Sequence, residues 1–343
     1  MMPNSRRRFI ASLSTLPLLP ALFPRALAPV FEYGALAMLT ACNRPPAAPL
    51  AIAAHLWPGY EPMFLARRER WLDERQVRLV ETLSATNSLQ LLAAGKIDGA
   101  ALTLDEVLRG RSGGMSLAVV LVFDISAGAD VLLVRPGIDE LAALKGRRIG
   151  VEQGALGALM FAKVLQAAGL MANEVRLVPL TVAEQFEAWQ RGKVDAVVTC
   201  EPVASQLVDK GAVRLFDSRQ IPDLIVDVLA LRTAAIDSHA EAIRHLLAAH
   251  FRALEHLHRN SQDAAYRMAG RLKLAPEQVL VAFKGLVLPD IANNRRLLAG
   301  ARPPLLAGAR TLSALMLKEG LLPRNDTLAN LLNADFLPHQ DLP

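Results

Sequence analysis

Cysteine is scarce in this chain, and the hallmarks of several protein classes are missing. Only Cys42 and Cys200 occur among the 343 residues, so a disulfide framework is excluded and stability must come from a packed core. Low-complexity and coiled-coil patterns are absent. The seven histidines are scattered, and His256 and His258 would lie on different faces of a helix, which argues against a metal site.

The apolar N-terminal region lacks the uninterrupted run of ~20 apolar residues that a transmembrane helix needs. It begins with Ser5-Arg6-Arg7-Arg8-Phe9-Ile10, which resembles a twin-arginine export signal. Leu39-Thr40-Ala41-Cys42 matches the bacterial lipoprotein box, in which the cysteine is acylated after cleavage. We therefore expect a signal peptide over residues 1–41 and lipidation at Cys42. Cleavage after Ala26-Leu27-Ala28 is the alternative, but Pro29 would then occupy a disfavoured first position.

Cleavage before Cys42 also changes the charge of the working protein. Four arginines and one glutamate lie in residues 1–41, so the formal charge falls from +5 to +2. This small excess removes the main argument for binding nucleic acid. Residues 42–49 contain three prolines and are expected to form a short, stiff tether.

The phrase Gly-Lys-[Ile/Val]-Asp occurs twice, at residues 95–98 and 192–195. Each copy follows a helix-like stretch and precedes a short apolar strand, with glycine in the position that ends a helix. A recurring helix-to-strand connector is the alternative, but the matching context favours two similar halves. In each half the carboxyl end of a strand would meet a helix N-terminus, and two such rims facing each other would form a binding cleft.

Strands and helices alternate from Leu50 onward, which is typical of parallel α/β sheets. The predicted strands span residues 50–56, 77–82, 99–103, 117–123, 130–134, 148–152, 175–180, 196–199, 213–216 and 225–231. The predicted helices span residues 62–72, 87–94, 105–109, 156–168, 183–190, 203–210, 240–258, 262–271, 276–286, 305–319 and 327–333. Two extended segments, 130–134 and 225–231, would connect lobe one (residues 50–130 plus 225–343) to lobe two (residues 131–224).

Five stretches of this alternating region carry a resemblance to a known family. They are Leu56-Trp57-Pro58-Gly59-Tyr60-Glu61-Pro62, the run from Ser84 to Gln90, the run from Asp124 to Asp130, the run from Leu144 to Gly154, and the run from Val194 to Pro202. In this order they resemble the periplasmic substrate-binding proteins of ABC importers, of the nitrate, sulfonate, taurine and thiamine-pyrimidine type. The resemblance covers Leu50 to Leu337 and implies the type II fold, with two α/β lobes, a two-segment hinge, and the C-terminal helices on lobe one.

The resemblance also implies a function and partners. A ligand would bridge the lobes and stabilise the closed state, which would dock on a membrane permease and ATPase complex. We expect no catalytic residues, no metal, no cofactor and no nucleic-acid partner, and a monomer attached to the membrane through Cys42. Two alternatives stay open. A similar fold occurs in a pyrimidine-synthesising enzyme of thiamine metabolism, and a sensor-coupled binding protein would have the same sequence features.

The candidate ligand contacts lie at predicted strand ends and helix N-termini. They are Trp57, Tyr60, Thr86, Asn87, Ser88, Thr103, Asp105, Ser126, Asp130, Glu152, Gly154, Thr199, Glu201 and Asp227. Several have structural alternatives: Trp57 and Tyr60 as loop anchors, one residue of 86–88 as a helix cap, and Glu201 as a helix-dipole partner.

The predicted rim is acidic, and no arginine or lysine falls at these strand ends. This pattern favours an amine or aminopyrimidine-like ligand that stacks on Trp57 or Tyr60 and donates N–H groups to carboxylates. A sulfonate, nitrate or taurine-type anion is the alternative, held by helix N-termini alone.

Overall fold

The computed structural model describes residues 48–153 and 155–339, and it contains two β-sheets. The first sheet has the order β11-β4-β10-β3-β1-β2, with β1 Leu50–Ala54, β2 Val77–Glu81, β3 Gly99–Thr103, β4 Leu117–Ser126, β10 Val226–Arg232 and β11 Leu286–Val287. The second has the order β7-β6-β8-β5-β9, with β5 Asp130–Val134, β6 Arg148–Val151, β7 Arg176–Pro179, β8 Ala196–Cys200 and β9 Val213–Asp217. The predicted α/β class with two sheets is confirmed. The predicted signal peptide, Cys42, most of the tether and Gly154 lie outside the described residues.

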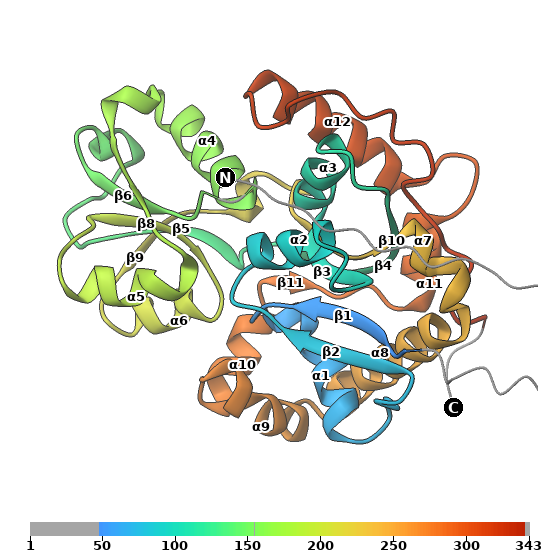
Figure 1. The fold of residues 1–343 in the computed structure, drawn as a ribbon. Coiled ribbons are helices and arrows are strands. Elements are labelled where there is room, and N and C mark those ends of the chain that lie inside the picture. The colour runs from blue at the N-terminus through green and yellow to red at the C-terminus, as the bar shows by residue number, and fades with distance from the viewer. Residues whose placement is uncertain (1–47, 154, 340–343) are drawn as a thin grey trace, which may run out of the picture. The chain divides into compact units, whose positions relative to one another are not determined.

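Helices cover both faces of the second sheet (Figure 1). Its helices are α4 Ala155–Ala168 on one face and α5 Val182–Gln190 with α6 Val203–Val208 on the other. The first sheet carries α1 Glu61–Arg68, α2 Ala85–Ala93, α3 Leu104–Ser112, α7 Thr233–Ser238, α8 Ala240–Arg259, α9 Ser261–Leu272, α10 Pro276–Phe283, α11 Ile291–Leu298 and α12 Pro304–Lys318. The C-terminal helices therefore share one apolar core with the first sheet. Among the described residues, we found no helix with the length and apolar character of a membrane span.

The repeated Gly-Lys-[Ile/Val]-Asp phrase has the same structural role in both halves. Asp98 accepts the backbone N–H of Ala51 at 2.9 Å, and Asp195 accepts the backbone N–H of Arg148 at 2.9 Å. In return, the backbone N–H of Asp98 donates to the carbonyl of Ala51, and that of Asp195 donates to the carbonyl of Arg148, both at 2.8 Å. The two phrases thus set the register between β1 and β3 in the first sheet and between β6 and β8 in the second.

The sheets are mixed rather than purely parallel. Strand β10 runs antiparallel to β3 and β4, and β5 runs antiparallel to β8 and β9. The short β11 also pairs antiparallel with β4. Strands β5 and β10 are the first that the chain forms after each crossing between the sheets. A strand that arrives from the neighbouring sheet is not bound by the strand-helix-strand connection that enforces parallel pairing.

The helix predicted over residues 327–333 is wrong, because this segment runs along the edge of β4. The backbone N–H of Val119 donates to the carbonyl of Leu331 at 2.7 Å, and the N–H of Asn333 donates to the carbonyl of Val119 at 2.8 Å. Leu328 and Asn330 have positive φ angles of 59° and 54°, which a helix cannot accommodate. The apolar residues of this irregular segment have a spacing that is also typical of a helix, so sequence periodicity could not distinguish the two structures.

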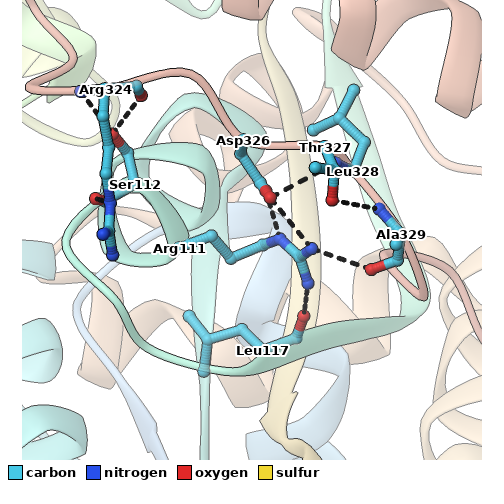
Figure 2. Close-up of polar contacts among 8 residues, drawn as sticks. All are labelled: Arg111, Ser112, Leu117, Arg324, Asp326, Thr327, Leu328 and Ala329. Atoms are coloured by element: carbon cyan, nitrogen blue, oxygen red, sulfur yellow. Dashed lines mark hydrogen bonds and ion pairs between the residues drawn. The ribbon is translucent and has the colours of Figure 1, made fainter.

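Arg111 fastens this C-terminal segment to the first sheet (Figure 2). Its guanidinium donates to both carboxylate oxygens of Asp326, to the carbonyl of Leu117 at 2.5 Å and to the carbonyl of Ala329 at 2.9 Å. The side chains of Arg111 and Asp326 are only 9% and 12% exposed. A planar fork with five N–H donors fits this set of four oxygens, and a lysine ammonium cannot reach all of them.

We expect Arg111→Lys to lower the free energy of unfolding by about 2 kcal/mol, because part of a mostly buried hydrogen-bond set is lost while the charge remains. Urea unfolding measures the change. Arg109→Lys on the same helix is the matched control, since Arg109 is exposed. Equal stability of the two variants would contradict the assigned role of Arg111.

Candidate functional site

A cavity of about 240 Å³ lies between the two sheets and is lined by residues from both. The carboxyl ends of β1, β3 and β8 reach it through Leu56, Thr103 and Thr199. Residues that follow a strand of an α/β sheet commonly bind ligands, because loops and helix N-termini meet there. The cavity has room for a small solute.

Four helix N-termini open onto the cavity. Its lining includes Ala85 of α2, Leu156 and Gly157 of α4, Val182 of α5 and Val203 of α6, each within the first turn of its helix. Backbone N–H groups in a first turn have no intrahelical partner and carry the positive end of the helix dipole. Helix α2 packs on the first sheet, whereas α4, α5 and α6 pack on the second, so a ligand among these N-termini would contact both halves of the chain.

Trp57 and Asp124 form a buried pair beside the cavity. The indole Nε1–H donates to Oδ2 of Asp124 at 3.0 Å, and Trp57 is only 4% exposed. A Cβ atom at Gly59 would lie 1.7 Å from the same carboxylate oxygen, so the Trp-Pro-Gly-Tyr turn requires glycine there. Trp57 therefore has a structural anchor and also lines the cavity.

Tyr60 and Asp227 form a second buried pair, in which the phenolic O–H donates to Oδ1 of the carboxylate. Asp227 stands directly opposite Asp124 in the register of β10 and β4. Burial raises the pKa of Tyr60, Asp124 and Asp227 above their ordinary values, and repulsion between the two carboxylates raises that of Asp227 further.

The other carboxyl groups around the cavity share this environment. Burial raises the pKa of Asp130 to about 7, and it raises the pKa of Asp105, Glu106, Glu152 and Glu201 as well. Protein hydrogen bonds satisfy these groups only in part, because both oxygens of Asp105 and Oδ2 of Asp130 lack a partner among the described residues. A carboxyl group with a pKa near 7 carries a proton for part of the time at neutral pH and can then donate a hydrogen bond.

Two other titratable side chains face the cavity. Burial lowers the pKa of His55 to about 4, so the imidazole is neutral, and its Nδ1 has no partner among the described residues. Burial raises the pKa of Cys200 well above its ordinary value, with the surrounding carboxylates adding to the effect. A thiol held in its protonated form is a weak nucleophile.

The cavity gathers some of the sequence-predicted residues but not all. Those that line it are Trp57, Thr103, Asp130, Glu152, Thr199 and Asp227. Tyr60 and Asp105 are fully buried next to this lining, and Ser126 bonds Ser218 at 2.8 Å where the chain crosses between the sheets. The backbone N–H of Ser205 donates to the Glu201 carboxylate, which is therefore a helix cap.

Of the predicted residues near the start of α2, none lines the cavity. Thr86 is exposed, Asn87 is half-buried, and the hydroxyl of Ser88 bonds Thr82 at 2.8 Å. The helix begins earlier than predicted, and Ser84 is the cap that accepts the N–H of Asn87. Ser84 lines the cavity in place of the three predicted residues.

Sequence reasoning missed other lining residues, among them His55, Glu106 and Lys273. His55 directly follows β1, so the rule that ligands bind at strand ends could have found it. Glu106 directly follows the predicted contact Asp105 in the first turn of α3. Lys273 lies beyond the last of the predicted contacts, Asp227, at the C-terminal end of a helix, and no local pattern pointed to it.

A sequence model of the NMT1-like family matches residues 43–273 of this chain. A relative in Escherichia coli (strain K12), named "Putative aliphatic sulfonates-binding protein", is 27% identical over 188 residues. This alignment covers 53% of the chain and 59% of the relative, so the chain matches less than two thirds of the relative's length.

Solved structures share the fold. The alkanesulfonate-binding protein SsuA from Xanthomonas axonopodis pv. citri, bound to MOPS, superposes with a TM-score of 0.69 at 20% identity, covering 84% of this chain and 97% of that one. The desulfurization enzyme DSZB superposes with a TM-score of 0.61 at 17% identity, covering 84% of this chain and 97% of that one. The predicted type II two-lobed fold is thereby confirmed, and this fold accommodates both binding proteins and an enzyme.

Proposed function

The chain belongs to the NMT1-like family, and from this we propose that it is the solute-binding component of an ABC importer whose ligand is a small organic anion of the sulfonate class. The observation that carries the proposal is the cavity between the two sheets, onto which four helix N-termini open. This ligand class replaces the amine or aminopyrimidine favoured by the sequence alone, which the comparisons do not support.

The helix N-termini supply the attraction for an anion. Free N–H groups and the positive ends of helix dipoles bind sulfonate-like and phosphate-like groups without any basic side chain. Apolar side chains, including Leu156, Met160, Phe186 and Val203, line the same cavity and suit the hydrocarbon part of a small sulfonate.

The acidic residues argue against an anionic ligand only if each of them carries a full negative charge at neutral pH. Burial raises the pKa of Asp124 and Asp130 to about 7, so both are protonated for part of the time at neutral pH and then present O–H donors. Binding an anion beside them favours the protonated forms further. We therefore infer that ligand binding takes up protons and tightens as the pH falls.

Transport follows from closure of the two halves around the ligand. The chain crosses between the sheets at residues 126–130 and 217–226, and these two crossings are the proposed hinge between lobe one and lobe two. A ligand that contacts helix N-termini of both halves would stabilise the closed form, which a permease and ATPase complex would recognise. The export signal, acylation at Cys42 and a periplasmic, membrane-anchored location belong to this same proposal.

Catalysis is the second candidate, because the fold is shared with a desulfurization enzyme and Cys200 lines the cavity. The raised pKa of Cys200 disfavours this reading, since burial and the surrounding carboxylates hold the thiol away from the reactive thiolate form. Binding without conversion is therefore the favoured function.

Matched ligands of opposite charge test the proposal directly. We expect 1-butanesulfonate to raise the melting temperature of the purified protein by several degrees at saturation, and 1-butylamine, which has the same apolar body, to leave it unchanged. Stabilisation by the amine alone would contradict the ligand class. Release of inorganic sulfur oxyanions from a sulfonate or sulfinate would identify an enzyme instead.

A further inference from the structure

Lys273 has a backbone conformation that a lysine rarely adopts. It is the C-cap of α9, with φ 55° and ψ 37°, in the left-handed region. Glycine or asparagine normally occupies this position at a helix end, because a Cβ atom there approaches the following carbonyl. The chain thus retains a lysine at a site where local backbone energetics favour glycine, which points to a role for its side chain.

That role is visible in the surroundings of Lys273. It lines the cavity between the two sheets, and no other lysine or arginine does so among the described lining residues. Its side chain is exposed and takes part in none of the ion pairs of the described chain. The ammonium group is therefore available to a ligand rather than committed to a protein carboxylate.

The segment that carries Lys273 reaches the opposite half of the chain. Gln278, in the first turn of α10, donates a hydrogen bond to Asp209 at the end of α6, which belongs to the second sheet. Gln206 of α6 lines the cavity together with Lys273. This contact joins α10, which follows the turn after α9, to the C-terminal end of α6 in the second half.

We propose that Lys273 supplies the one positively charged side chain that recognises the anionic head group of the ligand, an inference that rests on the proposed function of the cavity. The helix N-termini contribute partial charges from several directions, and Lys273 adds a full charge from the α9–α10 turn. The left-handed backbone is the means by which the chain directs this side chain to the cavity.

The test uses a substitution that should improve folding and impair binding. In Lys273→Gly we expect the melting temperature of the ligand-free protein to rise by about 2 °C, because glycine adopts the left-handed conformation without strain. We expect the dissociation constant for 1-butanesulfonate, measured by calorimetry at low salt, to increase about tenfold. Lys273→Arg should keep the affinity within about threefold, because the charge is retained.

Arg70→Gly is the matched control. Arg70 is also an exposed cation with a positive φ of 59°, and it does not line the cavity. It should gain similar stability with unchanged affinity. If the unmodified protein binds the sulfonate and Lys273→Gly binds it equally well, the role of Lys273 is overturned while the proposed function stands. If the unmodified protein binds no sulfonate, both are overturned.

Discussion

Replacing Asp130 by asparagine is expected to stabilise the ligand-free protein above pH 7 by about 4 kcal/mol relative to the unmodified protein. Asp130 is 2% exposed, and its Oδ2 has no hydrogen-bond partner among the described residues. Burial raises its pKa from 3.8 to about 7, and the neighbouring charges of Asp105 and Glu201 add to the rise. Asparagine removes the charge and keeps the shape.

The sign of the pH dependence follows from proton binding. The unfolded chain releases the Asp130 proton near pH 4, and the folded chain releases it near pH 7. Between these values the folded state holds more protons, so the free energy of unfolding falls as the pH rises. The advantage of Asp130→Asn should therefore be absent near pH 4, grow toward pH 7 and then level off.

Urea titrations from pH 4 to pH 8.5 measure this difference. Asp139→Asn is the matched control, because Asp139 is exposed and lies on the same half of the chain. A difference between Asp130→Asn and the unmodified protein that does not change with pH would show that burial does not raise the pKa of Asp130. If Asp130 binds a ligand, we expect the chain to keep this acid although it lowers the stability of the ligand-free protein.

Replacing Asn294 by leucine is expected to lower the free energy of unfolding by about 4 kcal/mol, because buried backbone groups of Val122 and Pro289 lose the hydrogen bonds of this side chain. The Oδ1 atom of Asn294 accepts the N–H of Val122 at 2.7 Å, and its Nδ2 donates to the carbonyls of Val122 and Pro289, both at 3.0 Å. The side-chain amide thus pairs with Val122 as a neighbouring strand would. Leucine has a similar volume but makes none of these bonds.

Asn294 completes the cover of the β4 edge that faces away from β10. Strand β11 pairs with Ser126 and Ile125, Asn294 pairs with Val122, and the segment around Leu332 pairs with Val119. An uncovered strand edge is a template for association with other chains. We therefore expect Asn294→Leu to aggregate more readily on heating, in addition to its lower stability.

Asn293→Leu provides the matched control for Asn294→Leu. Asn293 is the adjacent residue on α11, and it is exposed, with its side-chain Nδ2 donating to Asp290 at 2.9 Å and its Oδ1 accepting from Arg296 at 3.2 Å. Its replacement should cost less than about 1 kcal/mol. Urea unfolding of the two variants side by side decides the matter, and similar losses in both would exclude the edge-covering role of Asn294.

Local pattern was sufficient for the elements that form the two sheets. The predicted strands at residues 99–103 and 130–134 have the observed ends, because each is an apolar run bounded by a polar or glycine residue. Predicted helices shifted by a few residues at their ends, as α2 did when Ser84 rather than a later residue provided the cap. Sequence did not reveal α11, because Asn294-Arg295-Arg296 reads as a solvated surface.

The sequence by itself determined most of the strands and helices that form the two sheets and the recurrence of the Gly-Lys-[Ile/Val]-Asp phrase, because these depend on neighbouring residues. Only the tertiary structure decided that Lys273 joins the cavity, that Asn294 is buried against Val122, and that residues 327–333 follow the edge of β4. It also buries the cavity acids, which raises their pKa values. Such properties arise from contacts between distant segments and from the low polarity of a buried site, and neither is encoded in local periodicity.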